Sequence, residues 1–548
     1  MKKLSYILFM LLMSMTIAAQ PSQVQKAAKS VFTLTTFNEN GDIITSSQGV
    51  FIDGQGTGLC PFKPFIGAAR ATIIDASGKS NDVDAILGVD ELYDVAKVRV
   101  KSSTTAATIA TVAEKQGAQV WLVPYAIKNP AISKLDVSSV ENFHGSYNYY
   151  IFNGEVPDNA VGSPVFNGKG QVIGIMHKSD THTTAVDVAY IKQLTVTGLS
   201  SLDASLKETG VRTALPDSEE DAITMMTFKK GSTKQETYQA YADEFIEKFP
   251  TSSYGYRELA TLQTSQDLFA QAAATMEKSI SKSTKKDESH SDYGNLIYQK
   301  MVYKFDKPYD PWTLDKALEE TKKAYEINPQ PIYRHQQAQI IYAQGNYQEA
   351  YDIFMDLTKT PLENAELYYE AAQSKMQLQA PDTEIRVLLD SAVSVGKRKG
   401  MAAPYVLARG EYLYNMGAYR EALSDYNAYD TLTTSVDPVF FYMRYKCELQ
   451  VRQWQQALFD IARACYLNPK EPTYFAEWAS LDLRVKRYDE AISAATLCIQ
   501  LAPEYSDGYL LMGLAQIEKG MKEEGIKNLE KAKELGDTRA EELIEKNK

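Results

Sequence analysis

A 34-residue period in its C-terminal half limits what this chain of 548 residues can fold into. Ala457 and Ala491 end the similar runs QWQQA and RYDEA, and they lie 34 residues apart. Pro469 and Pro503 close the same two units with the same separation. Periods of roughly 20 to 50 residues are typical of solenoids and other repeat arrays. Because apolar residues recur at helical spacing between the prolines, the period predicts a stack of helical pairs.

Small residues recur at three places in a unit: in the first helix, at the turn and in the second helix. Within the helices, only small side chains let the two helices of a pair approach closely where they cross. The units supply Ala338, Gly345 and Ala350, then Gly410, Gly417 and Ala422, and finally Gly513 and Gly520. With the period, this pattern resembles the tetratricopeptide-repeat family over residues 235–548, as about eight helical pairs. The resemblance implies an all-α solenoid whose concave surface holds another protein or a peptide.

Some members of that family grip a C-terminal carboxylate with a lysine and an asparagine four residues apart on the inner helices. The matching positions here, such as His335 and Gln339, carry no such pair. Aromatic and apolar side chains face the groove instead, and we predict that these bind the partner: Tyr342, Tyr414, Tyr442 and Leu449. The alternative for each of them is simple packing within the solenoid.

The N-terminal half has a different pattern, in which short β-rich runs such as VFTLTTF and QVIGIMH alternate with turn residues. This pattern predicts an all-β domain over residues 20–199. Residues 200–234 are polar with mixed signals, and we interpret them as a linker with a short helix. The chain is therefore predicted to be multidomain, with an all-β part followed by the all-α solenoid.

Two segments of the β-rich half resemble trypsin-like serine proteases of the Deg/HtrA type. The first runs from GTGLCPFKPFIGAAR to DVAKV, and the second is DNAVGSPVFNGKGQVIGI. The resemblance implies a double β-barrel with a peptide-binding cleft. Peptide hydrolysis on that fold needs a serine nucleophile, a histidine base and an aspartate that orients the base.

Carried over residue by residue, the resemblance places Lys63 at the histidine position, Asp94 at the aspartate position and Val161 at the serine position. Valine has no oxygen that could attack a peptide bond, so only the aspartate of the triad remains. We therefore predict a pseudoprotease, and we expect Lys63 and Asp94 to form a structural ion pair. The alternative is an active envelope protease that uses Ser163 as nucleophile and Lys63 as base, with the repeats selecting substrates.

The first 19 residues have two lysines, an apolar run and the small residues Ala18 and Ala19, which together are typical of a secretory signal peptide. No later run is apolar and long enough to span a membrane. We therefore expect an exported protein in the periplasm of a Gram-negative bacterium. With 58 basic and 70 acidic residues the net charge is -12, and no basic block indicates nucleic acid binding.

Four cysteines are too few for a disulfide framework in a chain of this length, and we favour buried free thiols over a bridge. They are Cys60, Cys447, Cys465 and Cys498. His177 and His182 are expected to flank a solvated turn, and the absence of a third ligand candidate argues against a metal. No cofactor is predicted.

These inferences favour an exported, non-catalytic binding protein that combines a pseudoprotease domain with a partner-recruiting repeat array. The partner is predicted to be a protein or peptide held in the repeat groove. A third possibility is that the β-domain is only a spacer. The sequence names neither the partner nor the oligomeric state.

Overall fold

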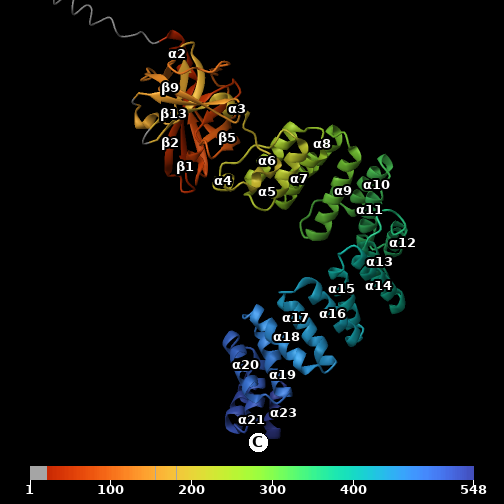
Figure 1. Ribbon diagram of the computed structural model, residues 1–548. Helices are drawn as coiled ribbons and strands as arrows, with labels where there is room; N and C mark the ends of the chain where they lie inside the picture. Colours follow the sequence, from red (N-terminus) through yellow and green to blue (C-terminus); the bar gives the residue numbers. More distant parts are fainter. Residues whose placement is uncertain (1–20, 155, 180–181, 548) are drawn as a thin grey trace, which may run out of the picture. The chain divides into compact units, whose positions relative to one another are not determined.

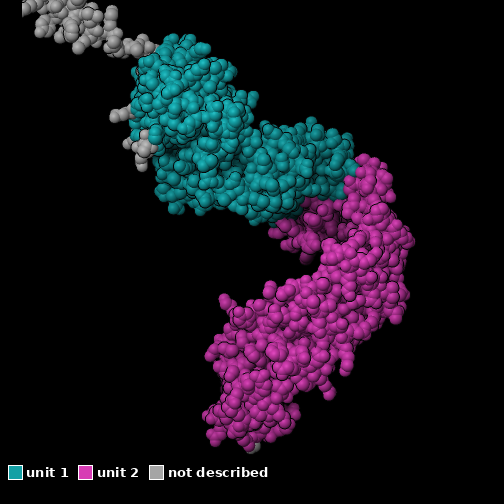
Figure 2. Space-filling model, viewed as in Figure 1, with its two compact units in different colours: residues 1–292 teal, residues 293–548 magenta. Residues whose placement is uncertain are grey.

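The computed structural model describes residues 21–154, 156–179 and 182–547 (Figure 1). The chain divides into two compact units, residues 1–292 and 293–548 (Figure 2), and each is described by itself. The signal peptide predicted for residues 1–19 lies outside the described residues. No helix in the described ranges is both long and apolar enough to cross a membrane.

Unit 1 begins with a short helix, α2 (Ser22–Ala27), and a closed six-stranded barrel in the order β1-β2-β3-β6-β5-β4. Side chains alternate between the buried interior and the surface along β1, so Phe32 and Leu34 point inward. The ring of Phe32 covers Gly49 of β2, where a Cβ atom would lie 2.4 Å from the Phe32 ring. The barrel strands are β1 (Val31–Phe37), β2 (Ile43–Phe51), β3 (Thr57–Cys60), β4 (Arg70–Ile74), β5 (Ser80–Asp90) and β6 (Val95–Val100).

A second barrel follows, in which β11, β8, β9, β10, β13 and β12 pair in turn and β12 closes the ring against β11. Strand β7 adds to it by parallel pairing with β12. The bounds are β7 (Thr108–Ile109), β8 (Gln119–Leu122), β9 (Ser133–Phe143), β10 (Tyr147–Asn153), β11 (Pro164–Asn167), β12 (Gln171–Lys178) and β13 (Thr183–Asp187). Helix α3 (Val188–Gln193) packs on this barrel. The all-β double barrel predicted from the sequence is confirmed.

Residues 200–234, which we expected to form a linker with a short helix, pack closely within unit 1. They include α4 (Ala204–Lys207) and α5 (Glu219–Lys229). Thr213 forms a parallel bridge with Ile86 of β5, and it is 2% exposed. Because the segment is polar on average, its sequence gives no sign of this pairing with the first barrel.

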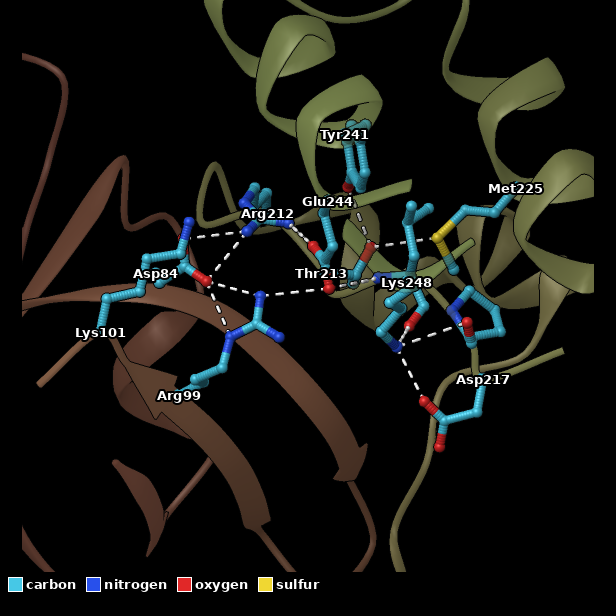
Figure 3. Close-up of polar contacts among 12 residues, drawn as sticks. Asp84, Arg99, Lys101, Arg212, Thr213, Asp217, Met225, Tyr241, Glu244 and Lys248 are labelled. Carbon is cyan, nitrogen blue, oxygen red and sulfur yellow. Dashed lines mark hydrogen bonds and ion pairs between the residues drawn. The ribbon is translucent and has the colours of Figure 1, made fainter. Parts of the chain in front are cut away.

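A buried ion-pair network joins this segment to the barrel and to α6 (Gln235–Lys248) (Figure 3). The Arg212 guanidinium donates to Asp84 of β5 at 2.9 Å and to Glu244 of α6. Arg99 of β6 completes the ring, 2.6 Å from Asp84 and 3.1 Å from Glu244. Arg212 and Glu244 are 7% and 5% exposed, so solvent screens their charges weakly.

Three further helices extend unit 1, and the last continues into unit 2. They are α7 (Ser253–Ser265), α8 (Phe269–Lys282) and α9 (Lys286–Tyr303). On α7, Glu258 is 3% exposed and accepts hydrogen bonds from Lys230 at 2.8 Å and from the Tyr238 hydroxyl at 2.7 Å. Packing between the end of α5, α6 and α7 therefore fixes a buried charge with two partners from other elements.

Unit 2 is all α, and consecutive helices pack against each other. The helices are α10 (Leu314–Ile327), α11 (Pro331–Ala343), α12 (Tyr347–Leu357), α13 (Ala365–Gln377), α14 (Asp382–Arg398), α15 (Ala403–Asn415), α16 (Tyr419–Thr433), α17 (Pro438–Gln450), α18 (Trp454–Leu467), α19 (Pro472–Arg484), α20 (Tyr488–Leu501), α21 (Ser506–Glu518), α22 (Lys522–Glu534) and α23 (Arg539–Asn547). Together with the helices of unit 1 they form the long all-α region predicted from the sequence, consistent with a solenoid.

The small residues within the repeat helices lie at helix contacts, as the sequence predicted, whereas Gly345, Gly417 and Gly520 lie in the turns between helices with positive φ. Ala350, Ala422, Ala457 and Ala491 are all fully buried. A Cβ atom at Gly410 of α15 would lie 3.1 Å from the ring of Tyr426 on α16. The period is visible in the helix boundaries as well, since α17 and α19 both begin at prolines, Pro438 and Pro472.

Candidate functional site

Three loops of the double barrel and parts of strands β9, β10 and β12 surround a cleft of about 660 Å³. Lys63 begins the short helix η2 (Lys63–Phe65) after β3, and Asp94 lies in the turn between β5 and β6. Val161 follows the short helix η3 (Asp158–Ala160), and His177 lies near the end of β12. The structure thus brings together the histidine, aspartate and serine positions implied by the resemblance.

Asp94 is held rigidly in its turn. Its Oδ1 atom accepts backbone N–H hydrogen bonds from Phe62 at 3.0 Å and from Lys63 at 2.7 Å. The backbone of Asp94 has φ of 50°, a left-handed conformation that aspartate and asparagine tolerate better than most residues. One carboxylate oxygen is therefore used to position the loop, and the other faces the cleft.

Two side chains lie near that second oxygen: Lys63, which is positively charged, and His177, which is charged only when protonated. Lys63 Nζ lies 3.9 Å from Asp94 Oδ2, but the lysine side chain is 74% exposed, so solvent weakens this pair. His177 Nδ1 lies 3.7 Å from the same oxygen, and its side chain is only 15% exposed. Burial lowers the pKa of His177 below its usual value. The positive charge of Lys63 also lowers this pKa, and the negative charge of Asp94 raises it by less than the two together lower it. His177 and His182 do flank the turn between β12 and β13, as expected, but the His177 side chain is largely buried beside Asp94 and not solvated.

The alternative nucleophile, Ser163, does not line the cleft that Lys63 lines. Ser163 is fully buried, and its Oγ donates a hydrogen bond to Gln48 Oε1 at 2.9 Å. Its backbone N–H donates to Ala160 at 2.9 Å. Gly162, which has φ of 84°, turns the chain between Val161 and Ser163, and a Cβ atom there would lie 2.5 Å from the Gln48 carbonyl oxygen. The side chains at positions 161 and 163 thus have different surroundings, and only Val161 lines the cleft.

The cleft wall is largely aromatic. Tyr93 and Phe143 pack with ring centroids 4.5 Å apart, and Tyr149 lies 6.3 Å from Tyr93. The Tyr149 hydroxyl donates to Thr184 at 3.0 Å, so it is occupied. Leu92, at the rim, is 85% exposed. Such a wall provides apolar contact area for a bound side chain.

We expect Asp94→Ala to lower the free energy of unfolding of unit 1 by about 1–3 kcal/mol, because two backbone N–H groups lose their acceptor. Asp94→Asn keeps an oxygen and tolerates the left-handed backbone, so a smaller loss is expected. Denaturant unfolding at neutral pH measures both. If Asp94→Asn leaves thermal stability unchanged across neutral pH, the Lys63–Asp94 ion pair contributes nothing measurable.

The groove residues named from the sequence are half-buried side chains of unit 2. Tyr342 packs edge-on against Tyr347 with centroids 5.2 Å apart, and Tyr414 packs in the same way against Tyr419 at 5.4 Å. The Tyr442 hydroxyl donates to Glu477 at 3.1 Å. Leu449 packs against the same core cluster as Tyr414 and Tyr442. These contacts leave part of each side chain exposed, and partner binding by them stays a prediction.

His335 and Gln339, at the clamp positions discussed above, contact a carboxylate of their own chain. His335 Nε2 lies 2.5 Å from Glu370 Oε2, and Gln339 Nε2 donates to Glu370 Oε1 at 2.7 Å. Glu370 is 8% exposed. The side chains at these two clamp positions therefore already bind a carboxylate of the same chain, that of Glu370.

The described residues contain no group of three or more histidine, cysteine or acidic side chains placed to hold a metal. All four cysteines are buried and unpaired, as expected from the sequence. Burial raises the pKa of the Cys60 thiol far above its usual value, and the nearby Asp94 charge adds to this. Cys60 therefore stays protonated and unreactive.

The match to a family model agrees with the fold of the double barrel. Residues 35–175 match the family model described as a trypsin-like peptidase domain. Among solved structures, the serine endoprotease from Yersinia pestis is similar at 18% identity, over 32% of this chain and 65% of that chain, with a TM-score of 0.29. This chain therefore spans just under two thirds of that protein. No match was found among curated proteins.

Two residues of the site were missed or misjudged from the sequence. Gln48 holds the loop on both sides of Val161, because its Nε2 donates to the Asn159 carbonyl at 2.8 Å while its Oε1 accepts from Ser163. No motif marks Gln48, since it lies 115 residues before Ser163. For His177 a signal existed: it lies one residue before the end of β12, the second strand after the loop that contains Val161.

Proposed function

We propose that this protein is an exported, non-catalytic binding protein, in which a pseudoprotease domain holds peptide and a tetratricopeptide array recruits a partner protein. The observation that supports the proposal is that Val161, to which the resemblance assigns the nucleophile position, lines the cleft together with Lys63 and Asp94. Of the described residues that line this cleft, none is a serine, threonine or cysteine. Covalent catalysis of acyl transfer needs such a nucleophile.

The cleft nevertheless retains what peptide binding needs. Its aromatic wall of Tyr93, Phe143 and Tyr149 provides apolar area, while Lys63 and Asp94 offer charges at the rim and floor. A cleft of about 660 Å³ has room for a large side chain of an extended peptide. The partner-binding residues Tyr342, Tyr414, Tyr442 and Leu449 are proposed to serve the second binding surface, in unit 2.

Export is proposed from the N-terminal sequence, whose lysines, apolar run and small residues are typical of a signal peptide. The trypsin-like fold is consistent with an envelope protein, and we propose the periplasm as its compartment.

A serine-directed fluorophosphonate probe tests the absence of a nucleophile. We expect no covalent adduct on the intact protein under conditions that label a trypsin-like protease completely. An adduct on Ser163 that disappears in Ser163→Ala would support the active-protease alternative and contradict this proposal. Thr184→Ala, which removes a hydroxyl elsewhere in the same barrel, is the matched control.

A further inference from the structure

Unit 1 contains a second cavity, of about 590 Å³, distinct from the cleft. It is lined by the segment 201–213, by the end of α5 and by the start of α6, with Glu39 and Ala69 of the first barrel. Arg212, Thr213 and Tyr241, drawn in Figure 3, form one of its walls. Nothing in the proposed function uses this cavity.

Positive charge is concentrated around the cavity although the chain is acidic overall, with a net charge of -12. Two of its four cations are neutralised, because Arg212 pairs with Asp84 and Glu244 and Lys234 lies 3.5 Å from Glu39.

The other two cations are Lys207 and Lys229. Within the described part of the chain, no ion pair or other contact accounts for either ammonium group. Burial lowers the pKa of Lys229, and the positive charge of Lys207 lowers it further. Two neighbouring cations beside a partly buried cavity repel each other, and an anion between them would relieve this repulsion.

A buried hydroxyl gives independent support. Ser201 lines the cavity and is only 8% exposed, yet its Oγ has no hydrogen-bond partner among the described residues. Leaving a buried hydroxyl without a partner costs roughly 1–3 kcal/mol. A group that accepts a hydrogen bond inside the cavity would remove this cost.

Part of the remaining wall is apolar, next to the hydroxyl side chains of Thr209, Ser232, Thr233 and Thr237. Leu206 and Val211 are buried, whereas Leu202 and Phe228 are 49% and 44% exposed although they are large hydrophobic residues. A ligand that covered Leu202 and Phe228 would remove apolar surface from water. The lining therefore combines unpaired positive charge, a hydroxyl donor and exposed apolar surface.

We propose that this cavity binds a small organic anion, with a carboxylate between Lys207 and Lys229 and an apolar body against Leu202 and Phe228. Its volume is in the range of ordinary small-molecule sites. The Ser201 hydroxyl donates to the bound anion.

Calorimetric titration of the intact chain with three probes tests the ligand class: octanoate, its neutral analogue octanamide, and inorganic phosphate. We expect octanoate to bind at least about tenfold more tightly than octanamide or phosphate. Equal binding of octanamide would overturn the role of the lysines. Phosphate binding as tight as that of octanoate would overturn the role of the apolar wall, and no octanoate binding at millimolar concentration would overturn the site.

The double variant Lys207→Gln/Lys229→Gln should weaken octanoate binding by about tenfold or more, and Ser201→Ala by about threefold. Lys282→Gln, an exposed lysine of α8 outside the cavity, should leave the affinity unchanged. Unchanged affinity in the double variant would contradict the proposal. In the unaltered chain, octanoate should slow acetylation of Lys207 and Lys229 but not of Lys282, and equal rates at all three would also contradict it.

Discussion

Glu244→Ala is expected to lower the free energy of unfolding of unit 1 by about 3–5 kcal/mol, because it leaves buried guanidinium charge without its partner. Glu244 is 5% exposed and lies within ion-pair distance of both Arg99 and Arg212. Its Oε1 also accepts a hydrogen bond from the Leu215 backbone N–H at 3.4 Å. Chemical denaturation, followed by a probe within unit 1, measures the loss.

Asp217→Ala is the matched control, since Asp217 is another acid that pairs with α6 but is 94% exposed. Its partner Lys248 keeps the Leu215 carbonyl as an acceptor at 2.6 Å, so we expect a change of about 0.5 kcal/mol or less. Equal losses in Glu244→Ala and Asp217→Ala would show that the buried network does not join the helical segment to the barrel energetically.

Unit 2 should become less stable as the pH rises from about 5 to 8, because two acids are buried at the same position of successive repeats. Glu448 of α17 and Asp482 of α19 are 3% and 0% exposed, and Glu448 Oε2 and both Asp482 oxygens have no hydrogen-bond partner among the described residues. Burial, with the Asp460 charge, raises the pKa of Glu448 to about 8. Burial, opposed by Arg487, raises the pKa of Asp482 to about 6.

The direction of this pH dependence follows from the difference in bound protons between the folded and unfolded states. Both carboxyls keep a proton in the folded protein at a pH where the unfolded chain has lost it. Their contribution to the free energy of unfolding is therefore greatest below the unfolded pKa near 4, and it is lost as the pH rises through the folded pKa values. Glu448→Gln should flatten the stability profile between about pH 6 and 8, and should raise Tm at pH 9 by roughly 2–4 °C for each kcal/mol recovered.

Thermal unfolding of unit 2 across pH 5–9 measures this dependence. Asp482→Asn should flatten the lower part of the same range, and Glu530→Gln, an exposed acid of α22, should leave the profile unchanged. A Glu448→Gln profile parallel to that of the unaltered chain would refute the assignment of the pH dependence to Glu448.

Local patterns made much of this fold predictable. The 34-residue period fixes helix length and the place of small residues, so Ala457 and Ala491 could be placed at helix contacts from the sequence. The framework motifs around Lys63, Asp94 and Val161 likewise identify one cleft, because each motif lies within a few residues of the position it marks.

Contacts between distant segments could not be predicted in the same way. The pairing of Thr213 with Ile86 depends on burying a few residues of a segment that is polar on average. The approach of His177 to Asp94 depends on how the two barrels face each other, which no single segment encodes. The hydrogen bond from Ser163 to Gln48 joins the same two barrels.

Mass spectrometry of a mixed peptide library incubated with the purified protein tests the central claim, that the double barrel binds peptide without hydrolysing it. We predict that a subset of peptides is retained intact and that no new termini appear. Val161→Trp, which fills the cleft, should reduce retention, whereas a substitution of exposed Lys282 should not. Cleaved peptides whose formation stops in Ser163→Ala or in His177→Ala would contradict the account.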